Sequence, residues 1–175
     1  AGLMGIVIRV AESDADLEAW RQVRLAVLPN ERALAVAEMQ AMRTPELTYL
    51  IAEIDGVLAG SGYGGRSSFD YAGLHPRVLP HARRQGVGTA LLRTLEAHAL
   101  THGFTEAGSL VDDPASLAFA ERFGFREVDR QVEQVRTIGA EVPALHDLGL
   151  RATPVSPAVE AIEMPDYRER SAQEG

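Results

Sequence analysis

The sequence contains no cysteine among its 175 residues. This absence excludes disulfide bonds, thiolate metal ligands and cysteine nucleophiles, and it is typical of a protein in a reducing compartment. Residues 1–5 lack the charged region and the long apolar run of a secretory signal. No apolar run approaches the length that crosses a membrane. We therefore expect a cytoplasmic protein without a membrane partner.

Basic residues are scarce relative to acidic ones. The chain has 17 lysines and arginines against 25 aspartates and glutamates, a formal net charge of −8. This charge opposes binding to nucleic acid and to anionic lipid. It is compatible with a cationic substrate, although solubility alone explains most acidic compositions. With 46% hydrophobic and 24% charged residues, the composition is that of one ordinary globular domain rather than of a disordered chain.

Hydrophobic periodicity and turn residues predict alternating strands and helices. Asp55 and Gly56 favour a two-residue hairpin turn between two β-rich runs. Ser13 is placed as the N-cap of a first helix, which Pro29 ends. The other predicted elements are strands at 6–10, 48–54, 57–63, 71–79, 105–111, 126–138 and 150–155, and helices at 31–43, 86–102, 114–123 and 141–148.

The element order, β-α-α-β-β-β-α-β-α-β-(α)-β, predicts an α/β (α+β) fold with a mixed sheet, because it joins a meander to two strand–helix–strand crossovers. We expect one domain over residues 1–155. Residues 156–175 are rich in acids and poor in large apolar groups, and they predict a tail or an arm that packs on a partner.

The segment between the predicted strand at 71–79 and the predicted helix at 86–102 indicates a chemical function. Gly86 and Gly88 lie at the start of the helix, and Arg83 and Arg84 precede them. The first amides of a helix have no partner within it, and the helix dipole adds partial positive charge there. Glycine lets a phosphate approach the main chain, and arginine adds fixed charge. The segment predicts an anion-binding turn; alternatively, it only joins a strand to a helix.

Two common phosphate-binding motifs do not fit this turn. The nucleotide P-loop needs Gly-Lys-Ser/Thr, which is absent, and the dinucleotide fingerprint needs a small residue where Leu91 stands. The remaining pattern is Arg/Gln-x-x-Gly-x-Gly/Ala, which occurs as Arg83-Arg84-Gln85-Gly86-Val87-Gly88.

With this pattern the sequence resembles the GNAT superfamily of N-acetyltransferases, over roughly residues 6–138. The predicted helix at 114–123, followed by Gly124 and Phe125, agrees with this resemblance. The resemblance implies a mostly antiparallel sheet and direct transfer of an acetyl group from acetyl-CoA to the primary amine of a small-molecule or peptide acceptor. A non-catalytic acyl-CoA-binding or sensing domain is the alternative. An unrelated α/β binding module whose glycine turn is structural is a third possibility.

The resemblance also implies where acetyl-CoA binds. Amides of the turn would hold the pyrophosphate, and the backbone of the preceding strand would pair with the pantetheine. The Val78 amide would hold the thioester oxygen. Asp113 would accept a hydrogen bond from the pantetheine or only cap the next helix. The implied cofactor-binding residues are Arg77, Val78, Arg83, Arg84, Gln85, Gly86, Val87, Gly88, Thr89 and Asp113.

The catalytic groups stay unidentified at this point. Ala120 stands where the family usually has the tyrosine that protonates the CoA thiolate, and Asp113 stands where it usually has asparagine. Candidates for a general base are Asp70, Tyr71, His75 and Asp112.

His98 and His102 have helical spacing, but no glutamate or third ligand accompanies them. We therefore interpret them as surface residues and predict no metal site. Residues 147–154 resemble the strand that closes the first half of tandem acetyltransferases. Two hypotheses account for the missing second half: the tail is a degenerate remnant of it, or a homodimer supplies the missing surface.

Overall fold

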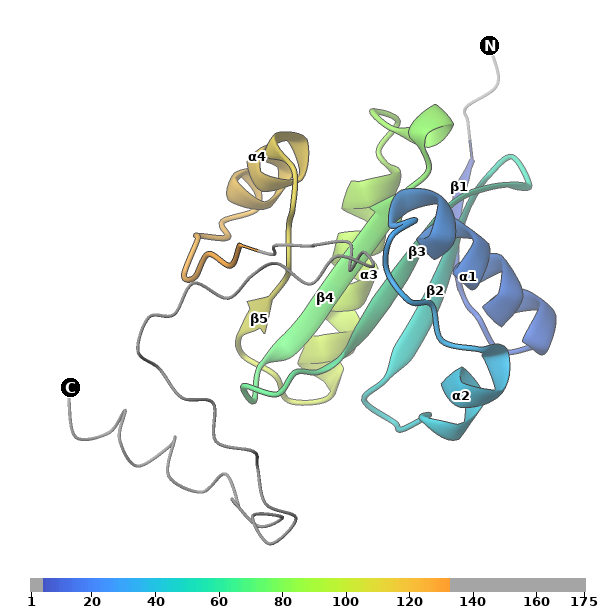
Figure 1. Cartoon of the computed structure of the whole chain (residues 1–175), viewed down its shortest axis with the longest axis horizontal. Coiled ribbons are helices and arrows are strands. Elements are labelled where there is room, and N and C mark those ends of the chain that lie inside the picture. Colours follow the sequence, from blue (N-terminus) through green and yellow to red (C-terminus); the bar gives the residue numbers. More distant parts are fainter. Residues whose placement is uncertain (1–4, 133–175) are drawn as a thin grey trace, which may run out of the picture. The chain divides into compact units, whose positions relative to one another are not determined.

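The computed structural model describes residues 5–132. The chain divides into two units, Ala1–Asp129 and Arg130–Gly175, and the elements described here belong to the first. In chain order they are β1 (Ile6–Val10), α1 (Asp14–Val27), α2 (Val36–Ala41), β2 (Thr48–Ile54), β3 (Val57–Arg66), β4 (Ala72–Val78), the 3-10 turn η1 (Pro80–Ala82), α3 (Val87–Thr101), β5 (Ala107–Gly108) and α4 (Pro114–Arg122) (Figure 1).

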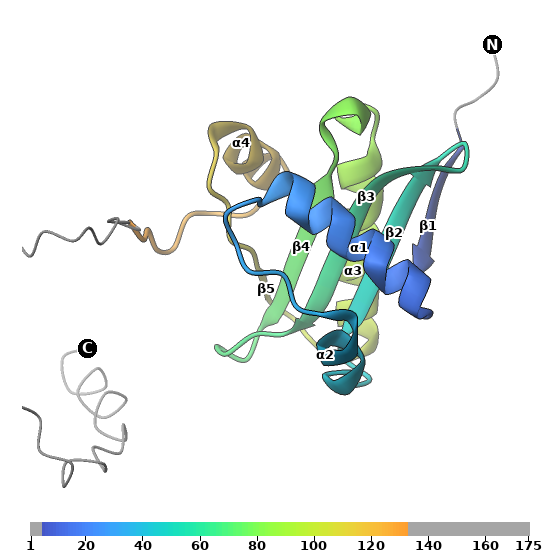
Figure 2. The same ribbon diagram turned by 45° about the vertical axis from the view of Figure 1, so that its right-hand side comes forward.

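The strands form one sheet in the order β1-β2-β3-β4-β5. The first four are antiparallel neighbours, and β5 is parallel to β4. Helices α1 and α2 cover one face of the sheet, and α3 covers the other (Figures 1 and 2). The predicted mixed, mostly antiparallel sheet flanked by helices is confirmed. No helix in the described residues is long and apolar enough to span a membrane.

Local sequence signals placed several element ends correctly. Asp55 and Gly56 both adopt positive φ, 49° and 80°, as the predicted hairpin turn between β2 and β3 requires. Ser13 caps α1 because its hydroxyl accepts a hydrogen bond from the Asp16 amide at 3.1 Å. The Asp16 carboxylate in turn accepts from the Ser13 amide and pairs with Arg9 at 2.6 Å, which lowers the pKa of Asp16 to about 2.

The second helix is shorter than the predicted span of 31–43. It begins at Val36 because the Glu38 carboxylate accepts the Ala35 amide at 2.7 Å and makes residue 35 the N-cap. Just before it, Arg21 donates to the Leu34 carbonyl at 2.6 Å and ties the connecting loop to α1. The prediction of helix over 31–35 was therefore wrong.

The strand predicted at 105–111 is also shorter, because β5 contains only Ala107 and Gly108. The Tyr71 ring packs so closely on Gly108 that a Cβ there would lie 2.5 Å from its Cε2 atom. The strand predicted at 126–138 is absent over 126–132. Its remainder, the elements predicted at 141–148 and 150–155, the domain boundary and the tail lie outside the described residues.

Glycines on β3 determine how closely α3 approaches the sheet. One stripe of α3 lies over alternate glycines of β3; its members are Val87, Leu91 and Leu95, above Gly60, Gly62 and Gly64. A Cβ on Gly60 would lie 2.5 Å from the Arg77 carbonyl oxygen and 3.2 Å from Val87. The small strand residues therefore fix the start of α3 beside the end of β4.

Candidate active site

The turn between β4 and α3 leaves helix amides without helical partners. Arg84 and Gly86 adopt positive φ, 63° and 90°, so the chain reverses and α3 starts at Val87. The first hydrogen bond within the helix runs from the Ala90 amide to the Gly86 carbonyl at 3.0 Å, and no side chain caps this end. The amides of residues 87–89 consequently have no acceptor within the helix. With the helix dipole, they can hold an anion.

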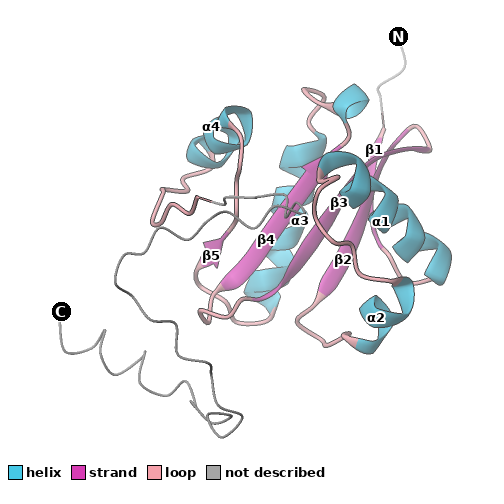
Figure 3. Cartoon of the chain, viewed as in Figure 1, coloured by secondary structure: helices cyan, strands magenta, loops and turns pink. Residues whose placement is uncertain are grey.

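Among residues 5–132, the edge of β4 that faces β5 is unpaired over most of its length. The Leu79 amide donates to Ala59 of β3, whereas the Ala72 amide donates to Glu106 on the opposite side, at 2.9 and 3.0 Å. Because amide direction alternates along a strand, the even-numbered residues of β4 face away from β3. Strand β5 pairs only with Ala72 and Gly73, and β4 runs on beyond it (Figure 3).

Two even-numbered residues define the chemistry of this open edge. Pro76 has no N–H, so it offers no donor there. The Val78 amide points away from β3 by the same alternation. The Val78 carbonyl accepts a hydrogen bond from Arg83 Nε at 3.3 Å. The end of the open edge therefore presents one backbone donor beside a guanidinium.

Helix α4 closes the site beside the turn. A Cβ on Gly88 would lie 3.4 Å from the Phe119 ring and 3.5 Å from Val78 Cγ2, so α3, α4 and β4 meet at this point. Asp113 caps α4 by accepting the amides of Ala115 and Ser116 at 2.9 and 3.0 Å. Its bonds to Ser116 are the first cause that lowers the pKa of Asp113. Capping, one of the two roles considered for Asp113, is confirmed.

Most of the predicted cofactor residues therefore gather around one turn. Val78, Arg83 and the start of α3 are neighbours, whereas Gln85 donates to the His81 carbonyl at 2.9 Å within the turn itself. Arg77 is different, because its side chain lies on the α1 face of the sheet and its guanidinium carbon lies 5.8 Å from the centre of the Trp20 ring.

The α1 face carries an aromatic row that crosses three strands. Tyr49, Tyr63 and His75 are register partners on β2, β3 and β4. Their ring centres lie 5.6 and 5.7 Å apart along the row. Trp20 of α1 packs on Tyr49 with ring centres 5.1 Å apart, and its indole N–H donates to the Gly62 carbonyl at 2.7 Å. The aromatic row therefore attaches α1 firmly to the sheet.

The next row on this face contains Ser61 opposite Arg77. Burial, together with the nearby Arg24 charge, lowers the pKa of Arg77 to about 10. Burial also lowers the pKa of His75 to about 4, with Arg77 and Arg24 as additional causes. At neutral pH the His75 imidazole is therefore uncharged while Arg77 remains a cation.

A cavity of about 160 Å³ opens on this side, between the β3–β4 loop and the end of β5. It is lined by Ser67, Ser68, Phe69, Tyr71, Gly73, His75, Gly108, Ser109 and Leu110. Of the four base candidates, Tyr71 and His75 thus line the cavity. Asp70 instead pairs with Arg66 and is 87% exposed, and Asp112 is exposed outside the lining.

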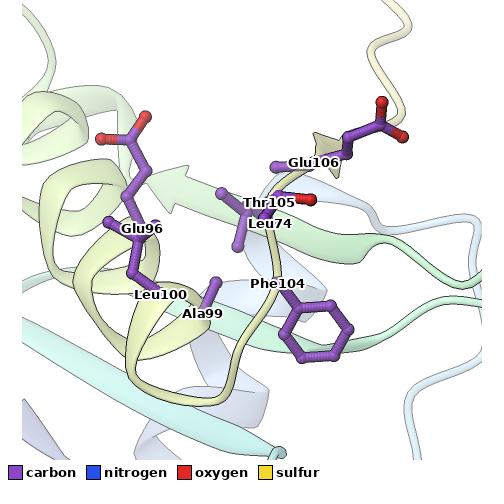
Figure 4. A pocket seen from close by; sticks show the side chains of 8 residues that line it. Leu74, Glu96, Ala99, Leu100, Phe104, Thr105 and Glu106 are labelled. Atoms are coloured by element: carbon purple, nitrogen blue, oxygen red, sulfur yellow. The ribbon is translucent and has the colours of Figure 1, made fainter.

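A larger cavity, of about 240 Å³, lies between α3 and β5 (Figure 4). Its apolar lining includes Leu74, Ala99 and Phe104. The carboxylates of Glu96 and Glu106 point away from these side chains (Figure 4). Since the cavity lies near the C-terminal half of α3, away from the turn at its start, we assign it no part in binding the cofactor.

His98 and His102 are half-buried rather than fully exposed. A ring nitrogen of each lies 2.9 Å from a main-chain carbonyl oxygen, of Glu46 and His98 respectively. Each imidazole must donate its N–H to that oxygen, so these histidines have a structural role.

The sequence model of the acetyltransferase (GNAT) family matches residues 12–125. The chain belongs to this family. An acetyltransferase of Pectobacterium atrosepticum is 27% identical over 129 residues, which cover 70% of this chain and 87% of the relative. Aminoglycoside N(6′)-acetyltransferase type 1 of Acinetobacter baumannii is 29% identical over 140 residues, which cover 73% of this chain and 96% of the relative.

Solved structures of this family share the fold. Aminoglycoside 6′-N-acetyltransferase AAC(6′)-Ih from Acinetobacter baumannii has a TM-score of 0.61 and 25% identity, with 77% of this chain and 100% of that chain covered. Aminoglycoside N-acetyltransferase AAC(6′)-Iy in complex with CoA has a TM-score of 0.63 and 23% identity, with 78% and 98% covered. The chain is an N-acetyltransferase of the GNAT family, and its acceptor is not identified.

In this GNAT enzyme, α4 carries no phenol at the usual position. Ala120 offers only its main-chain carbonyl, which accepts the amides of Phe123 and Phe125 at 3.0 and 3.1 Å. Sequence reasoning did not find the cluster of Trp20, Ser61 and Tyr63 on the α1 face. Alternation of Ser61 and Tyr63 with glycines along β3 is the signal that would have placed them on one face.

Proposed function

We propose that the enzyme binds acetyl-CoA with its pyrophosphate on the main-chain amides of residues 83–89 and its pantetheine along the open edge of β4. The observation that carries this proposal is the juxtaposition of helix amides without helical partners and an unpaired strand edge in the described residues. Arg83, Arg84 and the dipole of α3 favour a diphosphate at the turn. Gly86 and Gly88 keep side chains away from that diphosphate.

The acetyl group would be placed with its thioester oxygen at the Val78 amide. A backbone N–H held by a sheet is already oriented, so it stabilises the developing oxyanion without reorganisation. The acceptor amine would attack directly from the α1 face, where the cavity lined by Tyr71 and His75 opens. Holding both reactants in this geometry is the main catalytic contribution of the chain.

Two proton transfers accompany the attack. The neutral His75 imidazole is able to accept a hydrogen bond from the amine, but its low pKa makes it a weak base. The positive charges of Arg24 and Arg77 lower the pKa of a bound ammonium group and so favour the neutral amine that reacts. Since Ala120 supplies no acid, the departing thiolate would take its proton from water, from Tyr71 or from the amine itself.

The acceptor we propose is a small-molecule primary amine. Aminoglycoside N(6′)-acetyltransferase type 1 and the two solved enzymes described above are named for aminoglycoside acceptors, which makes a polyamine of this kind one candidate. The absence of cysteine supports a localisation in the reducing cytoplasm. The negative net charge argues against nucleic-acid and membrane partners. A homodimer stays a hypothesis that the solution mass tests.

The decisive experiment is calorimetric titration of the protein with acetyl-CoA and, separately, with CoA. We expect binding in the micromolar range. Gly86→Glu should weaken it by about 100-fold or more, since it adds a negative charge to the turn that would hold the pyrophosphate. Gly103→Glu is the matched control, because Gly103 also has positive φ, 82°, and lies beyond the other end of α3. Unchanged affinity in Gly86→Glu would show that the pyrophosphate binds elsewhere.

A further inference from the structure

Arg77 is a half-buried cation near the end of β4, on the α1 face of the sheet. Its Nη1 atom is buried and has no hydrogen-bond partner. Arg77 also forms no ion pair within residues 5–132. Burying a guanidinium without a partner opposes folding, and a hydrophobic side chain would pack on Trp20 without this penalty. Apart from the contact with the Trp20 ring and the nearby charge of Glu31, the described residues offer this guanidinium no compensation.

The surroundings of Arg77 are short of negative charge. Arg24 of α1 is close enough to lower the pKa of Arg77, and it already pairs with Glu31 at 2.8 Å. Glu31 is thus a single carboxylate near two guanidinium groups. Its own side chain is 55% exposed, so solvent weakens its attraction to Arg77. On β4 the neighbouring His75 is neutral. Two further neighbours, Trp20 of α1 and Ser61 of β3, have no ionisable side chain.

Ser61 adds unused hydrogen-bonding capacity at the same place. It lies directly opposite Arg77 in the β3–β4 register, and its hydroxyl is buried without a partner. Buried polar atoms of a folded protein are nearly always paired. Two unpaired polar atoms at adjacent positions therefore indicate a candidate binding position for a ligand.

That molecule is not the phosphate part of CoA. The α3 turn packs on the face that carries Leu74 and Val78, whereas the Arg77 side chain lies on the opposite face, against α1. Under the proposed function, the Val78 amide marks the reacting carbonyl, and Arg77 is the adjacent residue. The guanidinium is therefore on the side from which the acceptor amine arrives.

We infer that Arg77 binds an acidic group of the acceptor, and that this group is a carboxylate close to the reacting amine. The acceptor class is then amino acids and related amino carboxylates rather than polycationic amines, which two arginines repel. A guanidinium suits this task because it donates two parallel hydrogen bonds to one carboxylate. This inference rests on the proposed function, which places the acceptor on the α1 face.

Trp20 makes the inference measurable without turnover. It is the one tryptophan of the chain, and Arg77 lies over its ring. Its fluorescence is followed while the CoA-saturated protein is titrated with matched pairs that differ by one carboxylate: L-alanine and ethylamine, L-lysine and cadaverine, and L-phenylalanine and phenethylamine. At least one amino acid should give a saturable change at a concentration about tenfold or more below that of its decarboxylated partner.

Variants separate a specific contact from general electrostatics. Arg77→Met should reduce the preference for the carboxylate to within about twofold, and Arg77→Lys should restore it only in part, because an ammonium lacks the fork. Arg93→Met is the control, since it removes the same charge from an exposed position on α3. It should keep the full preference. A titration with O-phosphoethanolamine and ethanolamine tests whether Arg77 instead recognises a phosphate. A preference for the phosphate larger than the preference for the carboxylate would overturn the assigned acceptor class.

Three further results would overturn the inference: no response to any amino acid, equal or tighter binding of the decarboxylated partners or of tobramycin, or a preference that survives Arg77→Met. The proposed function fails separately. It requires that acetyl-CoA bind to the unaltered protein and that Gly86→Glu weaken this binding, and neither outcome depends on which acceptor binds.

Discussion

The two faces of the sheet are built from different chemistry. The face under α3 is mostly aliphatic, with glycines on β3 and leucines on the helix in direct contact. The face under α1 combines aromatic rings with Arg77 and His75. Three buried side-chain atoms without partners, in Tyr49, Ser61 and Arg77, all lie on this second face in the described part of the chain.

The two faces therefore contribute differently to stability and to ligand recognition. The α3 face is stabilised by close packing, and it holds in place the turn at which acetyl-CoA is proposed to bind. The α1 face leaves hydrogen-bonding capacity unused, which costs free energy in the absence of a ligand. Substitutions on the first face should therefore weaken folding, and those on the second should change binding or even strengthen folding.

The largest effect is expected at Gly60. Gly60→Ala places a methyl group 2.5 Å from the Arg77 carbonyl oxygen, a main-chain atom that cannot move aside alone. We expect a loss of about 3 kcal/mol or more in the free energy of unfolding. Urea denaturation followed by circular dichroism measures it. Gly62→Ala is the milder control, since its new Cβ would meet only side chains, at 3.3 Å. Equal stability of Gly60→Ala and the unaltered protein would contradict close packing on this face.

A second prediction concerns acid sensitivity of the α1 face. The folded-state pKa of His75, about 4, lies below the ordinary histidine value of 6.5, so the unfolded chain binds more protons between these values. Stability is then complete above about pH 6.5 and falls as the pH drops toward 4, by about 2 kcal/mol after allowance for partial exposure. His75→Phe should flatten this dependence in urea titrations at several pH values. A slope unchanged by the substitution would assign it to other groups.

The smallest of the three effects has the opposite sign. Arg77→Met removes an unpaired buried charge and leaves an apolar side chain against Trp20, so the unfolding free energy should rise by about 1 kcal/mol. Thermal unfolding of the variant without ligands measures this change. The exposed Arg93→Met variant should change stability by less. Destabilisation by Arg77→Met would mean that the guanidinium has a structural partner.

Local patterns predicted the parts of the fold that depend on neighbouring residues. The hairpin at Asp55 and Gly56, the cap at Ser13 and the turn at Gly86 follow from backbone preferences that single residues express. The lengths of α2 and β5 could not be predicted from such preferences, because they depend on contacts between distant residues, such as that of Leu34 with Arg21. Ser61 and Arg77 were not paired in advance, since only the β3–β4 register brings them together.

Pro76 has a consequence for self-association. An open strand edge usually recruits the edge of another chain, and edge-to-edge pairing leads to aggregates. Proline in the middle of this edge removes the donor that a docking strand would need between Leu74 and Val78. A strand from another chain therefore cannot form a continuous hydrogen-bond ladder along this edge. A flexible ligand that needs only the Val78 amide as a donor can still form its hydrogen bond. The same residue that protects the chain from its own copies keeps the edge available to a small molecule.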